Sequence, residues 1–160
     1  MEAGPMINHI LVAVDGSPFS FRAVRLGAKI LDRNVSGILT LLYVAKPKPD
    51  LEWFQGQGSD LNQVPIEERR ALDAAFKKGQ EILKEARVAC QDLLKEEFVR
   101  IETMVVPGEP ALKIIETAEK KRCEMIIIGS RGAGPLRGAL LGSVSQKVLN
   151  NCQCPVLIVK

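Results

Sequence analysis

Five short runs of hydrophobic residues recur along the chain, and each is bounded by residues that favour turns. They cover residues 10–14, 37–44, 99–106, 125–128 and 155–159. Four of them are nearly continuous and rich in β-branched side chains, which is typical of strands buried on both faces of a parallel sheet. The run at 99–106 alternates in part with polar residues, so we expect that strand nearer an edge of the sheet.

Stretches with hydrophobic positions at helical spacing lie between these runs. We expect the first helix to begin at Ser17 and Pro18, an N-cap followed by proline at the first helical position. Residues 66–97 contain no proline and one glycine, and they predict one long amphipathic helix. Residues 107–110 begin a third helix, and residues 143–149 form a fourth.

Strands and helices therefore alternate from end to end, which predicts an α/β fold whose parallel sheet has helices on both faces. Right-handed crossovers make such a sheet doubly wound. Ligands of doubly wound sheets bind beyond the carboxyl ends of the strands, where the winding reverses. Two segments in that position stand out, residues 15–17 after the first strand and residues 129–132 after the fourth.

Residues 46–65 interrupt the alternation with a segment that contains three prolines and two glycines. Long irregular loops are often functional or mobile. We expect this loop to be mobile without ligand. Trp53 and Phe54 either fold over a ligand or pack on the surface or on a partner subunit.

The composition narrows the class of protein. A chain of 160 residues with 46% apolar and 26% charged residues is typical of one globular domain, here residues 1–160. A net charge of +3 is too small for the dense basic patch of a nucleic-acid binder. No apolar run approaches the roughly 20 residues of a membrane span, and the first six residues lack the basic cluster of a signal peptide. We therefore expect a cytoplasmic protein that binds neither nucleic acid nor membrane.

The counts of histidine and cysteine limit the chemistry. One histidine, His9, excludes catalysis by a histidine pair and sites with several histidine ligands. The four cysteines are expected to be reduced thiols in the cytoplasm. Cys152 and Cys154 are spaced as metal ligands would be, but no second pair lies nearby in the sequence, so packing is the favoured interpretation.

The segment IGSRGAGPLRGALLGSVS, residues 128–145, runs from the fourth strand to the start of a helix. Glycines let backbone amides approach an anion closely, and the amides of residues 142–144 at a helix start would receive a phosphate. The hydroxyls of Ser143 and Ser145 and the guanidinium of Arg131 add donors. The segment lacks Gly-Lys-Ser/Thr and is not a P-loop. The alternative interpretation is a mobile loop in which Ser143 is a simple N-cap.

Asp15 strengthens the phosphate interpretation, because it ends a neighbouring buried strand. Its carboxylate would accept hydrogen bonds from a ribose diol. The alternative is an Asp-Gly turn without a ligand.

These residues also resemble a known family. The pattern Gly129-x-x-Gly132, nine residues, Gly142-Ser143 is similar to the nucleotide-binding signature of the universal stress protein family. The starting segment ILVAVDGS and the final CPVLIV resemble that family's first and last strands. The resemblance covers residues 9–160. It implies a Rossmann-like, adenine nucleotide alpha-hydrolase-like fold with five parallel strands in the order 3-2-1-4-5, and it places the chain in the ATP-binding subgroup.

The resemblance also implies the site. Asp15 would hold the ribose, Ala13 would lie near the base, and Val44 would hydrogen bond adenine through its backbone. A third group would surround the phosphates of ATP: Gly129, Arg131, Gly132, Gly142, Ser143, Val144 and Ser145. A bridging Mg²⁺ or Mn²⁺ would be held mainly by phosphate oxygens and water, because the loop contains no carboxylate.

Three functions remain open from the sequence. The favoured one is a regulatory, ATP-binding stress protein with no catalytic residues. A slow ATPase or an autophosphorylating enzyme is the first alternative, although phosphate chemistry needs a positioned base, and His9 is expected at the far end of the sheet. An interaction module that does not use nucleotide is the second, and the intact glycine pattern argues against it.

The final strand, residues 155–159, lies at a sheet edge in the family's strand order. A bare apolar edge strand favours pairing with another chain. We expect a homodimer through this strand, as many members of the family form.

Overall fold

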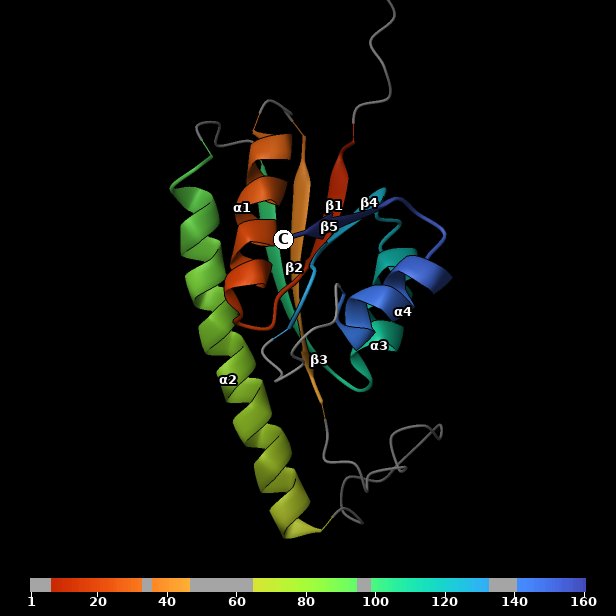
Figure 1. The fold of residues 1–160 in the computed structure, drawn as a ribbon. Coiled ribbons are helices and arrows are strands. Elements are labelled where there is room, and N and C mark those ends of the chain that lie inside the picture. The colour runs from red at the N-terminus through yellow and green to blue at the C-terminus, as the bar shows by residue number, and fades with distance from the viewer. Residues whose placement is uncertain (1–6, 33–35, 47–64, 95–98, 133–140) are drawn as a thin grey trace, which may run out of the picture.

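In a computed structural model of the protein, residues 7–32, 36–46, 65–94, 99–132 and 141–160 are described. Strands and helices alternate along them as predicted (Figure 1). The elements are β1 (His9–Ala13), α1 (Pro18–Leu31), β2 (Ile38–Ala45), α2 (Ile66–Gln91), β3 (Arg100–Pro107), α3 (Pro110–Lys120), β4 (Met125–Gly129), α4 (Ser143–Asn151) and β5 (Val156–Val159).

The strands form one parallel sheet in the order β3-β2-β1-β4-β5, which confirms the predicted topology. Val12 at the centre pairs with Leu41 on β2 and with Ile127 on β4. The winding reverses at β1, because the chain continues to β2 on one side and β4 pairs on the other. β3 is an edge strand, as its partial alternation predicted.

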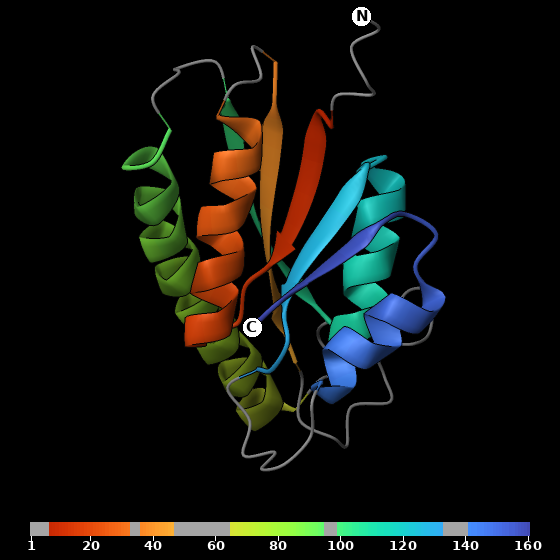
Figure 2. The same cartoon turned by 45° about the horizontal axis from the view of Figure 1, so that its top comes forward.

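Helices cover both faces of the sheet, with α1 and α2 on one side and α3 and α4 on the other (Figure 2). Alternate residues of β1 explain the two layers. Ile10 and Val12 pack with side chains of α1 and α2, whereas Leu11 and Ala13 pack with those of α3 and α4. All four are at most 9% exposed, and this burial on both faces is what their continuous apolar run predicted.

The helix starts follow the local sequence. Ser17 is the N-cap of α1 and its side chain accepts a hydrogen bond from the Ser20 amide, with Pro18 at the first helical position. The Glu109 carboxylate caps α3 in the same way by accepting from the Leu112 amide. These caps place the ends of β1 and β3 directly against the start of a helix.

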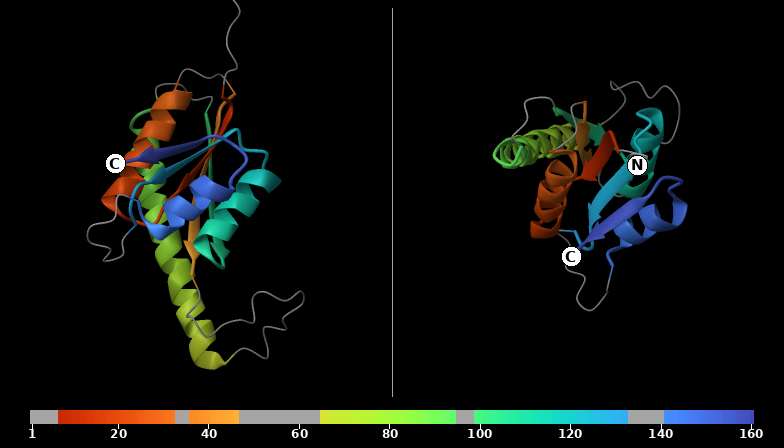
Figure 3. Two further views of the ribbon diagram at one scale, coloured as in Figure 1. Left: turned by 45° about the vertical axis from the view of Figure 1, so that its right-hand side comes forward. Right: turned by 90° about the horizontal axis from the view of Figure 1, so that it is seen from above.

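The predicted end of α2 at residue 97 is wrong, because the helix ends at Gln91. The amides of Leu93 and Leu94 both donate to the Cys90 carbonyl, which closes the last turn, and both side chains pack against the core. The amino-terminal turns of α2 extend past the sheet, as both Figure 1 and the left view of Figure 3 show. The five strands and α4 begin and end within two residues of their predicted bounds, and α1 and α3 begin where the sequence predicted.

Among the described residues, no helix combines the length and the apolar character that crossing a membrane requires. The expected mobility of the loop at 46–65 concerns residues 47–64, with Trp53 and Phe54, and these lie outside the described residues.

Candidate functional site

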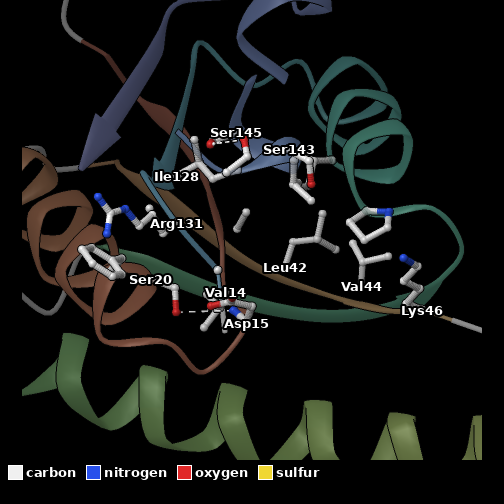
Figure 4. A pocket seen from close by; sticks show the side chains of 18 residues that line it. Val14, Asp15, Ser20, Leu42, Val44, Lys46, Ile128, Arg131, Ser143 and Ser145 are labelled. Carbon is white, nitrogen blue, oxygen red and sulfur yellow. Dashed lines mark hydrogen bonds between the residues drawn. The ribbon is translucent and has the colours of Figure 1, made fainter. Parts of the chain in front are cut away.

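A cavity of about 720 Å³ opens beyond the carboxyl ends of β1, β2 and β4, between the starts of α3 and α4 (Figure 4). This is the position at which the winding reverses. Its volume lies within the range of roughly 300–1,000 Å³ that is usual for small-molecule sites. The residues predicted from the sequence all line this cavity: Ala13, Asp15, Val44, Gly129, Arg131, Gly132, Gly142, Ser143, Val144 and Ser145.

Asp15 is half-buried at the end of β1 and is held by a turn of its own. Its Oδ1 accepts a hydrogen bond of 2.9 Å from the Ser17 amide. Gly16 between them has φ +86°, a conformation that favours glycine. The turn that the alternative interpretation predicted is therefore present, and Asp15 also lines the cavity.

The two predicted motifs meet at that second oxygen. A Cβ placed on Gly132 would lie 2.7 Å from Asp15 Oδ2. A side chain at position 132 would therefore press against the carboxylate of Asp15. The absence of a side chain at position 132 is what lets the ends of β1 and β4 share one cavity.

Hydrogen bonds at Ser130 hold the two described ends of the glycine-rich segment together. The carbonyl of Ser130 accepts a 2.7 Å hydrogen bond from the Gly142 amide. The Ser145 hydroxyl lies 3.1 Å from the same carbonyl and 2.8 Å from the Gly142 carbonyl, to either of which it donates. The amide of Ser130 in turn donates to Val159 on β5. Residues 133–140 lie outside the described residues, and the hydrogen bonds at Ser130 join the described residues on either side of them.

These hydrogen bonds correct three details of the site that the sequence predicted. Gly142, not Ser143, is the N-cap of α4, and Ser143 is its first residue. The Gly142 amide already donates to the Ser130 carbonyl, so it is not one of the amides that would bind an anion. Ser145 is only 2% exposed, and its hydroxyl donates to a backbone carbonyl.

The amides at the start of α4 that could bind an anion are therefore those of residues 143–145 instead of residues 142–144. α4 has no side-chain cap, and its first intrahelical bond runs from the Gln146 amide to the Gly142 carbonyl. The amides of Ser143, Val144 and Ser145 therefore have no acceptor within the helix. They form the positive end of the helix dipole, where an anion is stabilised.

Gly129 and Gly142 differ in how much space their surroundings leave for a side chain. A Cβ on Gly129 would lie 2.8 Å from Phe19 Cβ and 3.0 Å from the Phe19 carbonyl carbon, so packing of β4 on α1 requires glycine there. Gly142 is different. Its φ of −71° suits any residue, and a Cβ would meet nothing closer than 3.5 Å. Nothing in the described structure requires a glycine at 142, because a Cβ there would make only ordinary van der Waals contacts with the backbone of residues 130–132.

One side of the cavity is apolar, and of its residues the sequence analysis named only Val44. Leu42 and Val44 of β2 line this side (Figure 4), together with Pro110 and Ile114 of α3, and Lys46 after the end of β2 also lines the cavity. Val14, Phe19, Ser20 and Ile128 also line the cavity. The position of Pro110 and Lys46 just after the ends of strands was a usable signal, whereas the inward direction of Leu42 and Ile114 depends on packing.

The charged groups of the cavity are few among the described residues. Asp15 is the one carboxylate in the lining, and Arg131 and Lys46 are its cations. Tyr43 lies on the opposite face of β2 from Leu42, and burial together with the nearby Asp15 charge raises the pKa of its hydroxyl. No cluster of three or more His, Cys, Asp or Glu side chains suited to a metal ion occurs in the described part of the chain.

His9 lies at the other end of the sheet, as expected. It is the first residue of β1, and its Nε2 lies 2.9 Å from the hydroxyl oxygen of the buried Thr40. The cavity begins at Ala13, at the opposite end of the same strand.

Comparison with known proteins identifies close similarities along the whole chain. The family model described as "Universal stress protein family" matches residues 6–160. Universal stress protein YxiE of Bacillus subtilis is 35% identical over 158 residues, which cover 97% of this chain and 100% of YxiE. Universal stress protein MJ0531 of Methanocaldococcus jannaschii is 34% identical, over 97% of this chain and 83% of that protein.

Solved structures share the fold. Universal stress protein UspA from Lactobacillus plantarum has a TM-score of 0.79 at 20% identity, over 98% of this chain and 100% of that one. A universal stress protein in complex with cAMP has a TM-score of 0.68 at 22% identity, over 97% and 98%. A family protein from Arabidopsis thaliana with AMP bound has a TM-score of 0.62 at 22% identity, over 96% and 91%.

Proposed function

Because the chain belongs to the universal stress protein family, we propose that it binds ATP and acts as a regulatory nucleotide-binding protein of the stress response. The observation that carries the proposal is the meeting of Asp15 and the glycine loop in one cavity. Two structures that share the fold are described with AMP or cAMP bound, which supports an adenine nucleotide as the class of ligand.

The residues that line the cavity form three groups, which would contact the phosphates, the ribose and the base of an adenosine phosphate. The phosphates would lie over the amides of Ser143, Val144 and Ser145, with Arg131 nearby as a counter-charge. The ribose diol would bond Asp15, which lines the cavity beside Gly132.

The base would enter the apolar side. Leu42 and Ile114 offer the apolar contact that a purine ring needs. Ala13 and the backbone of Val44 lie at the ends of the central strands, where they would contact the base.

A divalent cation would reach this site with the nucleotide. Mg²⁺ keeps several waters and is commonly bound through substrate phosphates. The lining fits that arrangement, because its one described carboxylate is assigned to the ribose. Mg²⁺ or Mn²⁺ would supply charge neutralisation between the phosphates, and the chain would hold it through the nucleotide.

We include a homodimer through β5 in the proposal. β5 pairs with β4 alone within the described sheet, so its other edge is unpaired in one chain. Pairing with the β5 of a second copy would satisfy both edges about a two-fold axis.

Two variants at Gly142 test nucleotide binding. Gly142→Ala adds a Cβ that the unliganded fold accommodates at 3.5 Å, so its melting temperature should match that of the wild type. Gly142→Val places a larger group in the same position. Calorimetric titration with ATP and Mg²⁺ should show weakened binding for Gly142→Ala and none for Gly142→Val.

The control is Ser36→Ala, an exposed position just before β2, the opposite end of which lines the cavity. It should bind ATP as the wild type does. Nucleotide analysis of the purified wild-type protein provides a second readout and should find adenine nucleotide. Unchanged ATP affinity in both Gly142 variants, together with protein that carries no nucleotide, would refute the proposal.

A further inference from the structure

Two thiols approach each other at the connection between α4 and β5. The Sγ atoms of Cys152 and Cys154 lie 3.2 Å apart. A disulfide has an S–S distance of about 2.05 Å, so the two sulfurs need to approach by only about 1.2 Å. We propose that Cys152 and Cys154 form an oxidation site at which a peroxide produces a reversible intramolecular disulfide.

The connection is able to make that movement. Cys152 is the C-cap of α4 and its amide bonds the Val148 carbonyl, which holds the first thiol in place. Cys154 lies between that cap and Pro155, whose carbonyl accepts from Ile126 on β4. Both cysteines precede the ladder of β5, which begins at Val156. The sulfurs can therefore close without breaking a strand hydrogen bond.

Exposure distinguishes this pair from the other two cysteines. Cys152 and Cys154 are half-buried, whereas Cys90 is fully buried and Cys123 is 7% exposed. Burial raises the pKa of the Cys90 thiol to about 12 and that of Cys123 to about 11. A small oxidant in water therefore reaches the pair more readily than it reaches either buried thiol.

The two thiols of the pair have different roles. Burial, and after it the hydrogen bond with Cys152, raises the pKa of Cys154 to about 12. Because the Cys154 thiol loses its proton less readily than an ordinary thiol, we assign Cys152 as the attacking sulfur and Cys154 as the resolving one.

The chemistry balances with hydrogen peroxide as the oxidant. The Cys152 thiolate attacks the peroxide, an S–O bond forms, the O–O bond breaks, and the departing hydroxide takes a proton to become water. The Cys154 sulfur then attacks the sulfenic sulfur of Cys152, an S–S bond forms, and the S–O bond breaks. The departing hydroxide takes the Cys154 proton. Two thiols lose two electrons in total, and the peroxide yields two waters.

The position of the pair suggests a reversible modification rather than a structural bond. A disulfide across one intervening residue closes a very short loop, so it constrains the unfolded chain little. The pair also lies at the end of α4 that is opposite to the start of the helix at the cavity (Figure 2). Its oxidation therefore does not depend on the proposed nucleotide site.

Digestion with trypsin tests the site directly. Cleavage after Lys147 produces a fragment, residues 148–160, that contains both cysteines of the pair, whereas Cys123 and Cys90 fall in other fragments. The intact protein is treated with one equivalent of hydrogen peroxide and then digested under conditions that prevent thiol exchange. The 148–160 fragment should lose the mass of two hydrogen atoms and regain it with dithiothreitol. Accessible thiols after denaturation should fall from four to two.

Variants separate the roles of the two sulfurs. Cys154→Ser should leave a sulfenic acid on Cys152 that dimedone captures, and Cys152→Ser should slow the reaction with peroxide. Cys123→Ala is the matched control and should form the disulfide as the wild type does. A disulfide that joins two tryptic fragments, or oxidation of Cys152 directly to sulfonic acid in the wild type, would overturn the proposal.

Discussion

Single residues at this site carry two physical roles at once, and Asp15 shows the consequence. One carboxylate oxygen closes the turn after β1 by accepting from the Ser17 amide, and the other lies against Gly132 at the cavity. A substitution at Asp15 therefore changes the local turn as well as any ligand contact. Variants at this position must separate these two effects.

Asp15→Asn and Asp15→Ala together achieve that separation. Asparagine keeps an oxygen for the Ser17 amide but removes the charge, whereas alanine removes both. A hydrogen bond to a charged group is worth about 1.5–3 kcal/mol, so each variant should weaken ATP about tenfold or more. Only Asp15→Ala should also lower the melting temperature. In calorimetry, a wild type that binds ATP and 2′,3′-dideoxy-ATP equally would contradict the ribose role.

His9 is the second residue whose surroundings set a measurable property. Burial lowers its pKa below the ordinary 6.5; of the charges that face it, Glu102 and Glu124 oppose the shift, and Lys121 and Arg100 add to it. The unfolded chain therefore takes up a proton at a higher pH than the folded one does. The stability contribution is complete above the unfolded pKa of 6.5 and is lost as the pH falls through the lower folded pKa.

His9→Gln tests this linkage. The wild type should lose unfolding free energy as the pH is lowered from about 7 to about 5, and the variant should lose less over the same interval. Urea unfolding at a series of pH values provides the measurement. Glu102 is a separate effect, because its hydrogen bond to Lys121 lowers the Glu102 pKa below 4.5, so its loss belongs to more acidic solutions. Equal pH slopes for the two proteins would exclude His9 as the cause.

At the scale of elements, glycines decide how closely helices approach the sheet. Gly79 is buried in the middle of α2, where a Cβ would collide with the ring of Tyr43 on β2. Gly27 lets α1 approach Leu39 and Val12, which a Cβ would meet at 3.0 Å and 3.1 Å. The long helix α2 thus contacts the sheet at a position where its sequence is least favourable for a helix.

Gly79→Ala therefore reverses the usual effect of this substitution. Alanine is favoured over glycine in a helix by about 1 kcal/mol, but overpacking costs about 1–3 kcal/mol. We expect a lower unfolding free energy for Gly79→Ala in the wild-type background. The same substitution in a Tyr43→Ala background should raise it, because the ring is absent. Urea unfolding of the four proteins measures the coupling, and a stabilising Gly79→Ala in the wild type would contradict the collision.

At the scale of the whole molecule, the edge of β5 decides how two copies can associate. The amides of Ile126 and Ser130 donate to the carbonyls of Pro155 and Val159. Because backbone groups of alternate residues point to opposite sides of a strand, Ile158 has its amide and carbonyl on the outer edge. Leu157 instead faces β4.

Proline at these two neighbouring positions should have different effects. Ile158→Pro removes a donor from the outer edge and leaves the ladder with β4 in place, so the dimer should dissociate. Because the side chains of Ile158 and Leu157 both pack against the core, both variants lose apolar contacts, and Ile158→Pro should lower the melting temperature less than Leu157→Pro does. Leu157→Pro removes a donor on the β4 side and should lower the melting temperature. Sedimentation velocity at micromolar concentration, with thermal melts, measures both. A wild-type monomer under these conditions, or an Ile158→Pro dimer as stable as the wild type, would refute the interface.

The order of the elements and the place of the cavity were determined by the sequence itself. Buried strands and amphipathic helices differ in period, so their alternation specifies a parallel α/β sheet. The handedness of the crossovers then restricts where the winding reverses. The ten site residues that the motifs and the family resemblance implied line one cavity at that position. The end of α2 was misplaced because residues 93 and 94 keep the apolar pattern while they leave the helix to pack on the core.

Only the tertiary structure decided which groups in those motifs are available to a ligand. The Gly142 amide and the Ser145 hydroxyl look like ligand donors in the sequence, but the amide donates to the Ser130 carbonyl and the hydroxyl to the Ser130 or the Gly142 carbonyl. Gly129 and Gly142 look alike, yet packing against Phe19 requires only the first. The approach of Cys152 to Cys154 likewise depends on the path of the chain between α4 and β5. The reason is common to all three: hydrogen bonds and close contacts depend on where distant segments meet, and a periodic pattern carries no information on those distances.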